Sequence, residues 1–269
     1  MGLYIIKKES AKKYGTRIGK KPYMIEATAL ESIDVNWPDD FKLAELIAAG
    51  AREKDRSLLG NIIINLNSSI LSDILDEMGY KNQIIKSLKP NIETSKILGR
   101  AKTLKLRKLK KGENFKGIYE ALNSYETVVP NDIILVENEC PDYAYFGELN
   151  TNLAIRSGCS GVIIGGMTRD SSAVKNANLP VFSKGFSCQD VKNRVTTESI
   201  NKKIRIGGVD IAPNCLIFAD NEGIVVIPKS IENQVIIKAN QIVANEKNIL
   251  SAIASGISID ELTKKYGFF

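Results

Sequence analysis

The chain of 269 residues has no histidine, and its four cysteines form no CxxC pair. A zinc site of Cys and His ligands is therefore not expected, and neither is a mechanism that uses a histidine base or a Ser-His-Asp triad. Any chemistry has to come from carboxylates, lysine, arginine, tyrosine or a metal ion held by oxygen atoms. The sequence also lacks a signal peptide and an apolar run of membrane-spanning length, and its unpaired cysteines suit a reducing compartment. We therefore expect a cytoplasmic protein that does not act in a membrane.

Hydrophobic residues make up 43% of the chain and charged residues 25%, which is ordinary for a globular protein. The length allows one large domain, or one domain with an appendage. The net charge is +6, and the basic residues are scattered apart from one run, Lys105 to Lys111. Such a run can bind nucleic acid or anionic lipid, but it is not interleaved with aromatic residues that would stack on bases. We interpret it as a strand end and a solvated turn closed by Gly112, and we expect no nucleic-acid partner.

The first 59 residues differ in composition from the rest of the chain. They carry dense charge and the only tryptophan, Trp37. Residues 3–6 and 23–26 have the apolar and aromatic composition of strands. A turn-rich stretch over residues 34–40 leads into a helical pattern over residues 41–51, for which Asp39 or Asp40 is a suitable N-cap. We expect an N-terminal extension, residues 1–59, and a main domain, residues 60–269.

The main domain contains many short strand patterns. Residues 68–79 predict a helix with one apolar face, and Gly79 suits its C-terminal cap. Short runs rich in β-branched residues predict strands at residues 101–106, 132–136, 161–164, 179–182, 203–206, 216–219 and 223–227. Further helices are predicted at residues 117–123, 149–157 and 231–254. Many strands with few helices between them favour an α/β fold of the mixed β/β/α sandwich kind over a strictly alternating doubly wound sheet.

The segment 146–170 holds the residues best suited to chemistry. Residues 147–150 open a predicted helix, and free N–H groups at a helix start can hold a carboxylate. A buried strand and a glycine pair then lead to Arg169 and Asp170. Arg169 can fork onto a carboxylate or enolate oxygen, and Asp170 offers the hard oxygen ligands that Mg²⁺ prefers. Taken alone, Arg169 and Asp170 suit a surface ion pair at a strand end equally well.

Glu148, twenty intervening residues and then Arg169-Asp170 resemble the acidic-X20-Arg-Asp signature of the RraA-like and 4-hydroxy-4-methyl-2-oxoglutarate / 4-carboxy-4-hydroxy-2-oxoadipate aldolase family. The resemblance extends over residues 60–269. It includes a helix at residues 71–75, a Gly-x-Ala-x-Thr strand at 99–103, Pro-Val-Phe at 180–182, closing strands at 207–228 and a C-terminal helix with residues 246 and 255–258. It implies the swivelling-domain fold of that family and a homotrimer or homohexamer with active sites between subunits.

The resemblance also implies a role for each signature residue. Asp170 holds Mg²⁺ or Mn²⁺, partly through waters, and Arg169 neutralises the enolate left by C–C cleavage. Glu148 orients a water that relays protons. Glu246 is the acid contributed by a neighbouring subunit, although a solvated helix glutamate describes it equally well. The 2-keto acid substrate is bound by Arg169 together with Gly147, Glu148, Leu149 and Asn150. The implied activity is that of a divalent-metal-dependent, class II pyruvate aldolase or 2-keto acid decarboxylase.

Two positions depart from the family pattern. Gly165-Gly166 stands where the family often has Asp-Gly or Asp-Ala. This departure bears on the substrate more than on the metal site. Glu148 stands where the well-studied aldolases carry aspartate, and its longer arm changes which water it orients.

Residues 23–46 resemble a different family, the C-terminal end of acylneuraminate/Kdo-type cytidylyltransferases. Asp34 matches the first acid of that ending, whereas Asn36 replaces the second, a metal ligand. A glycine-rich nucleotide loop is missing from the sequence, so nucleotidyl transfer by this chain alone is not expected. The resemblance implies a fused tail, a nonulosonate- or Kdo-like sugar acid as substrate, and a cytidylyltransferase as partner. If the segment serves in docking or dimer contacts, Trp37 and Phe41 are suitable apolar anchors. The alternative is a lineage-specific extension.

Two non-enzymatic functions compete with the aldolase. One is an RraA-like regulator that binds a ribonuclease or another protein partner. RraA-like proteins that inhibit ribonuclease E are shorter and acidic, whereas this chain is basic with a pI of about 9.0. The other is a structural partner for a separate cytidylyltransferase.

Overall fold

The computed structural model of the chain describes residues 5–26, 28 and 32–267. Its internal contacts divide the chain into two compact units, residues 1–57 and residues 58–269. The boundary falls inside helix α2, Pro38–Ile62. Leu59 and Ile62, at the end of that helix, are buried in the core of the second unit.

The first unit contains helix α1, Lys8–Tyr14, and most of α2. The strand predicted at residues 23–26 is wrong, because these residues are exposed and have no regular structure. Of the other predicted strand, residues 3 and 4 lie outside the described part of the chain, and Ile5 and Ile6 are not in a strand. A β-strand needs a neighbour for its backbone hydrogen bonds, and the described residues of this unit provide none.

Helix α2 begins earlier and ends later than its apolar pattern predicts. Pro38 occupies its first position, where a missing N–H has no cost. The Asp40 carboxylate accepts the backbone N–H groups of Trp37 at 2.9 Å and Asn36 at 3.1 Å. Neither Asp39 nor Asp40 is therefore the predicted N-cap: they are the second and third helical residues, and Asp40 reaches back to the chain before the helix as in a capping box.

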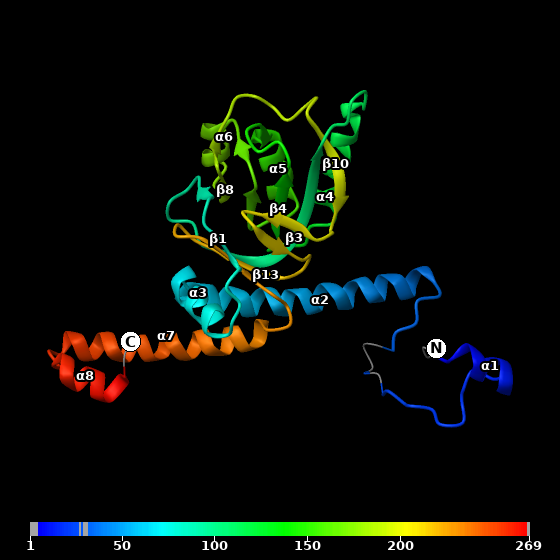
Figure 1. Cartoon of the computed structure of the whole chain (residues 1–269), viewed down its shortest axis with the longest axis horizontal. Coiled ribbons are helices and arrows are strands. Elements are labelled where there is room, and N and C mark those ends of the chain that lie inside the picture. The colour runs from blue at the N-terminus through cyan, green and yellow to red at the C-terminus, as the bar shows by residue number, and fades with distance from the viewer. Residues whose placement is uncertain (1–4, 27, 29–31, 268–269) are drawn as a thin grey trace. The chain divides into compact units, whose positions relative to one another are not determined.

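Strands of the second unit form a large mixed sheet (Figure 1). Its strands are Ile84–Ile85 (β1), Lys89–Pro90 (β2), Ile97–Lys108 (β3), Ile133–Asn138 (β4), Gly161–Ile164 (β6), Val181–Ser183 (β8), Val195–Ile200 (β10), Leu216–Ala219 (β13) and Ile224–Ile227 (β14). Among the described residues the order is β1-β14-β13-β3-β4-β6-β8-β2, and β10 also pairs with β3. The neighbours β3, β4, β6 and β8 run parallel, and the other pairings are antiparallel.

Two smaller sheets and the helices complete the unit. Three short parallel strands, Ala144–Phe146 (β5), Met167–Thr168 (β7) and Gly185–Phe186 (β9), pair in that order. A hairpin joins Ile204–Ile206 (β11) to Val209–Ile211 (β12). The helices are Ile63–Asn65 (η1) and Phe115–Leu122 (η2), both 3₁₀, and Ser68–Glu77 (α3), Asn123–Glu126 (α4), Glu148–Arg156 (α5), Ser171–Asn176 (α6), Glu232–Ala254 (α7) and Ile259–Tyr266 (α8).

The long strand β3 joins the two halves of the large sheet. Its first residues pair with β13, as in Leu98 with Phe218. Its last residues pair on the same edge with β10, as in Leu106 with Thr197. Its central residues pair in parallel with β4 on the other edge. The mixed β/β/α fold class is therefore confirmed.

Three apolar clusters fill the second unit. One lies between the large sheet and the β11–β12 hairpin and includes Ile133, Phe182 and Ile206. A second lies between the sheet and the layer of η2, α4, α5 and α6, and a third lies under α3 and α7. Figure 1 shows these helices on opposite sides of the strands. Each additional buried CH₂ contributes about 0.8 kcal/mol, so these clusters stabilise the scaffold on which the loops sit.

Most predicted elements of the main domain are present. The strands at residues 161–164 and 216–219 have their predicted bounds, and the predicted helix at 117–123 is the 3₁₀ helix η2. Helix α3 begins after Asn67, whose side chain accepts the Ile70 N–H at 2.7 Å. Gly79 follows the C-cap with φ +83°, and the Tyr80 N–H reaches the Leu75 carbonyl at 2.8 Å, which closes the helix in a Schellman motif. Of the strands of two or three residues, β8 and β11 were predicted, at residues 179–182 and 203–206, whereas β1, β2, β5, β7 and β9 were not, because a segment so short is defined by its partner.

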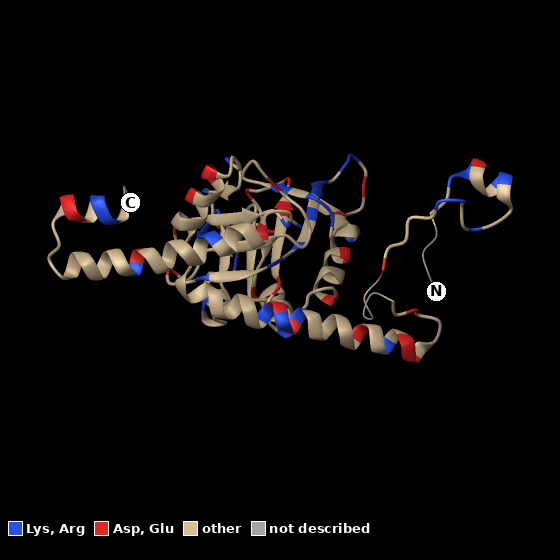
Figure 2. Ribbon diagram, turned by 90° about the horizontal axis from the view of Figure 1, so that it is seen from below, with Lys and Arg blue, Asp and Glu red and all other residues tan. Residues whose placement is uncertain are grey.

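The basic run ends strand β3, and a turn with Gly112 at φ +80° follows it. Lys105 lies within 4.0 Å of three glutamates, Glu137, Glu139 and Glu198, and Arg107 pairs with Glu113 at 2.5 Å. The hydrogen bond from Arg107 lowers the pKa of the Glu113 carboxyl to about 2. Figure 2 likewise shows acidic residues interspersed with the lysines and arginines of the second unit.

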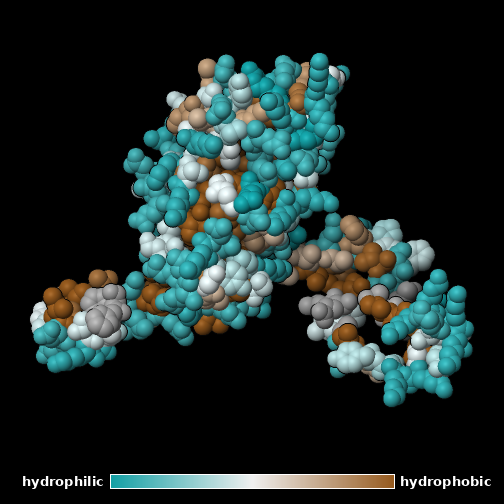
Figure 3. All heavy atoms as spheres, viewed as in Figure 1, coloured by the Kyte–Doolittle hydropathy of each residue, from teal (hydrophilic) through white to brown (hydrophobic). Residues whose placement is uncertain are grey.

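Several large apolar side chains lie at the surface. In α7 and α8, Leu250 and Ile259 are exposed, and Figure 3 shows hydrophobic atoms at the surface of the C-terminal helices. Among the described residues, no single helix has both the length and the apolar composition to cross a membrane. Only a bent pair, Pro38–Asn65 with Ser68–Glu77, reaches that length and composition together.

Candidate functional site

A cavity of about 370 Å³ opens beside the three-stranded sheet β5-β7-β9. One wall is the apolar face of η2, and the opposite side carries charged and amide groups. The lining residues are Ile118, Tyr119, Ala121, Leu122, Tyr145, Gly147, Glu148, Leu149, Asn150, Arg169, Asp170, Asp190, Val191 and Lys192. The cavity therefore contains every predicted site residue of the segment 147–170.

The parallel pairing of β5 and β7 brings the two ends of the acidic-X20-Arg-Asp signature together. Phe146 pairs with Thr168, and the Arg169 N–H donates to the Phe146 carbonyl at 2.9 Å. The carboxyl ends of parallel strands meet at one edge of a sheet. Gly147 and Glu148 therefore leave β5 beside the residues that leave β7.

Gly147 makes this close approach sterically feasible. A Cβ atom at this position would overlap the Asp170 Oδ2 atom and lie 3.0 Å from Cγ of Arg169. No other residue type fits here without moving one of the two side chains that define the site.

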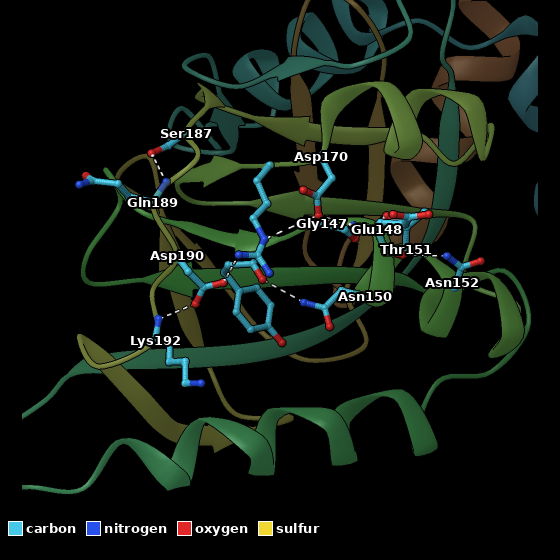
Figure 4. Close-up of polar contacts among 12 residues, drawn as sticks. Gly147, Glu148, Asn150, Thr151, Asn152, Asp170, Ser187, Gln189, Asp190 and Lys192 are labelled. Carbon is cyan, nitrogen blue, oxygen red and sulfur yellow. Dashed lines mark hydrogen bonds and ion pairs between the residues drawn. The ribbon is translucent and has the colours of Figure 1, made fainter.

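Asp170 has a backbone conformation that few residues adopt. Its φ of 53° and ψ of 40° lie in the left-handed region, which aspartate tolerates better than most residues. Its Oδ2 atom accepts the Glu148 N–H at 3.1 Å and lies 3.6 Å from Arg169 Nε (Figure 4). In the described part of the chain, no hydrogen bond engages its Oδ1 atom. Strain of this kind is often found at functional sites.

Asp190 is a site residue that the sequence did not reveal. Its Oδ2 atom lies 2.8 Å from Arg169 Nη1, and its Oδ1 atom accepts the Lys192 N–H at 2.6 Å (Figure 4). It follows β9, which pairs in parallel with β7. The loops after β5, β7 and β9 thus meet at one edge. No spacing in the sequence signals this, because β9 has only two residues.

The predicted substrate-binding residues at the start of α5 differ in their contacts. The Glu148 side chain is exposed at the cavity, and Leu149 is 79% exposed. The Asn150 side chain donates to the Tyr145 carbonyl at 2.9 Å and so fixes the end of β5. Burial raises the pKa of the Tyr145 phenol, which stays neutral.

Glu246 does not lie at the cavity of its own chain. It is exposed on α7 and is not among the cavity-lining residues. Its predicted role across a subunit interface stays a prediction.

The oxygen atoms at the cavity suit a cation that keeps much of its hydration. The described residues contain no cluster of three or more Cys, Asp or Glu side chains placed to hold a metal. The available ligands are the Oδ1 atom of Asp170 and the exposed Glu148 carboxylate, which both line the cavity. Mg²⁺ is commonly bound by one or two carboxylates and several waters, so this donor set fits Mg²⁺ or Mn²⁺ and not a structural zinc ion.

Comparison with known proteins identifies the family. Residues 68–226 match the family model described as "RraA-like: Aldolase/RraA". The match covers more than half of the chain and contains the whole signature from Glu148 to Asp170. The chain therefore belongs to the RraA-like aldolase family, as the resemblance predicted.

Two relatives and one solved structure are similar over most of the chain. Protein DlpA of Legionella pneumophila is 34% identical over 206 residues, 76% of this chain but 33% of DlpA, so the chain spans about a third of that relative. A protein of Halalkalibacterium halodurans named "Putative 4-hydroxy-4-methyl-2-oxoglutarate aldolase" is 31% identical over 195 residues, 71% of this chain and 86% of the relative. The crystal structure of an uncharacterized protein from Pseudomonas syringae pv. tomato has a TM-score of 0.67 and 26% identity, and covers 77% of this chain and 94% of its own.

Proposed function

We propose that this chain is a divalent-metal-dependent lyase that cleaves a C–C bond of a 2-keto acid and releases pyruvate. The observation that carries the proposal is the meeting of Arg169, Asp170 and the start of α5 in one cavity. The aldolase name of relatives at modest identity supports the same reaction class.

The start of α5 is proposed to bind the substrate carboxylate. The first N–H groups of a helix have no acceptor inside the helix. The Glu148 N–H is taken by Asp170, and the Thr151 N–H by the Gly147 carbonyl. The N–H groups of Leu149 and Asn150 remain for an anion, and the helix dipole adds to their attraction.

The cation would be held by Asp170 Oδ1, with Glu148 orienting a water next to it. When bound, Mg²⁺ or Mn²⁺ supplies Lewis-acid polarisation of the keto group. For a 4-hydroxy-2-keto acid, the 4-hydroxyl gives its proton to the water at Glu148, the C3–C4 bond breaks, C4 leaves as a carbonyl product, and the electron pair of the broken bond passes into the enolate of pyruvate. Arg169 donates to the oxygen on which this charge develops, and a proton delivered to C3 through the water at Glu148 completes pyruvate.

Several finer assignments belong to this proposal. Assembly into a trimer or hexamer would bring Glu246 of one subunit to the cavity of another, and the cytoplasm is the proposed compartment. The extension at residues 1–59 favours a nonulosonate- or Kdo-like sugar acid and a cytidylyltransferase partner, on resemblance alone. No contact of the described residues favours the ribonuclease-binding regulator.

The test is a pyruvate-release assay over a panel of 2-keto acids. The panel contains oxaloacetate, 4-hydroxy-4-methyl-2-oxoglutarate and a sugar acid with a 2-keto group, each with Mg²⁺, with Mn²⁺ and with excess chelator. A blank without protein corrects for spontaneous oxaloacetate decarboxylation, and Asp170→Asn is the matched variant. We expect metal-dependent release that Asp170→Asn abolishes. Full activity in excess chelator, or in Asp170→Asn, would refute the metal assignment.

A further inference from the structure

We propose that Asp190 is a positioning residue, which holds the Arg169 guanidinium in the orientation that the reaction needs. This inference rests on the proposed lyase function. It concerns a residue outside the Glu148–Asp170 signature, in the loop after β9.

Arg169 lies between two carboxylates. Its Nη1 atom is 2.8 Å from Asp190, whereas its Nε atom is 3.6 Å from Asp170. The shorter contact is the stronger one, and it directs one edge of the planar guanidinium toward Asp190. Among the described residues, no hydrogen bond engages Nη2, so this nitrogen is left to donate to a substrate oxygen.

The Asp190 carboxylate is itself fixed. Its Oδ1 atom accepts the Lys192 N–H, and its carbonyl accepts Nη1 of Arg194 at 2.8 Å. The residues on both sides of Asp190 are tied to β5: the Ala144 N–H donates to the Gln189 carbonyl at 2.8 Å, and the Val191 N–H donates to the Ala144 carbonyl at 3.0 Å. The position of the carboxylate is therefore fixed relative to β5, the strand that ends at Phe146 directly before Gly147.

Stability is a poor explanation for this ion pair. The side chains of Arg169 and Asp190 are 40% and 34% exposed, and exposed ion pairs contribute little to folding. Without Asp190, the nearest anionic partner of the guanidinium is Asp170. A fork of Arg169 onto Asp170 would occupy the Oδ1 atom that the cation is proposed to use. Asp190 thus keeps Arg169 and Asp170 available for separate tasks.

The test compares two Asp→Asn variants that each remove one short ion pair. Asp190→Asn removes the contact to Arg169, and the control Asp210→Asn removes the 2.7 Å contact to Lys203 on the β11–β12 hairpin, outside the cavity. With oxaloacetate and Mg²⁺, we expect Asp190→Asn to lower kcat by roughly 10- to 100-fold, as for other residues that orient a catalytic group. We expect KM to be equal or lower, because one anion no longer competes with the substrate for Arg169. Asp210→Asn should keep both constants, and both variants should keep the melting temperature.

A double-mutant cycle with Arg169→Lys separates positioning from an independent role. If Asp190 acts through Arg169, Asp190→Asn has little further effect in the Arg169→Lys background. Asp190→Glu keeps the charge and should restore part of the lost kcat; it also serves if the Asn variant does not fold. An equal loss in both backgrounds, no rescue by glutamate, or a kcat of Asp190→Asn within about twofold of wild type overturns the inference while leaving the lyase intact. Absence of turnover by the wild-type chain on the whole panel overturns both.

Discussion

A single methyl group at Gly147 tests whether the close approach of β5 and β7 serves activity and not only packing. In Gly147→Ala the new Cβ would overlap Asp170 Oδ2 and crowd Cγ and Nε of Arg169, at 3.0 and 3.2 Å. The backbone at Gly147 is extended, with φ −153°, so the alanine backbone itself is unstrained. The conflict is therefore confined to the two side chains of the site.

The expected losses of stability and of activity depend on which atoms can move to make room for the new Cβ. Carbon and oxygen atoms pack at about 3.5 Å, so the Asp170 carboxylate has to shift by on the order of 1 Å. Because it is the end of a half-exposed side chain, the shift costs at most about 1–2 kcal/mol, the lower part of the range for overpacking. A misplacement of about 1 Å at a reacting group can lower the rate by about 100-fold. We expect a nearly normal fold with very low activity.

The matched control is Gly60→Ala, near the C-terminal end of α2. A Cβ there meets nothing within 4 Å, and alanine in a helix is more stable than glycine by about 0.5–1 kcal/mol. In thermal unfolding, the melting temperature of Gly147→Ala should lie about 2–8 °C below that of wild type, because each kcal/mol corresponds to about 2–4 °C. The melting temperature of Gly60→Ala should lie slightly above that of wild type. Pyruvate release should be unchanged in Gly60→Ala and lost in Gly147→Ala.

Wild-type activity in Gly147→Ala would refute the reasoning, because it would mean that Asp170 and Arg169 can move without consequence. Unfolding of Gly147→Ala at low temperature would refute it in a different way, since it would assign Gly147 to the stability of the sheet edge.

Three further predictions follow from single features. Arg169→Lys should lose about 10²–10³ in rate, because an ammonium cannot reproduce the planar fork, and a rate within about twofold of wild type would make Arg169 structural. Burial raises the pKa values of Cys159 and Cys215 to about 12, so at pH 8 both remain thiols. Mass spectrometry after brief alkylation should therefore find the exposed Cys188 modified and these two protected until the chain unfolds, and their rapid labelling would contradict the packing. Deleting residues 1–57 should leave an active lyase. A deletion that extends through Leu59, which is 3% exposed, should lower the free energy of unfolding by about 1.5–3 kcal/mol. Equal melting temperatures of the two truncated proteins would contradict the core position of Leu59.

Patterns along the chain predicted the main strands and helices of the second unit because those elements are long enough to carry their own signal. The apolar face of α3 and the buried runs of β6 and β13 are defined by local side-chain periodicity. The same reasoning failed at residues 23–26, where an apolar run has no partner strand among the described residues. It also missed β5, β7 and β9, which have two or three residues each and exist only through their mutual pairing.

The sequence by itself determined the chemical identity of the site: a chain without histidine that carries Glu148, Arg169 and Asp170 at the spacing of its family. It could not determine which neighbours these residues would meet. Asp190 enters the site because three short parallel strands end at one edge, and Gly147 is required because those strands approach within contact distance. Such relations depend on backbone hydrogen bonds between segments far apart in the chain. The register of those bonds is set by the packing of the whole sheet and not by any local run of residues.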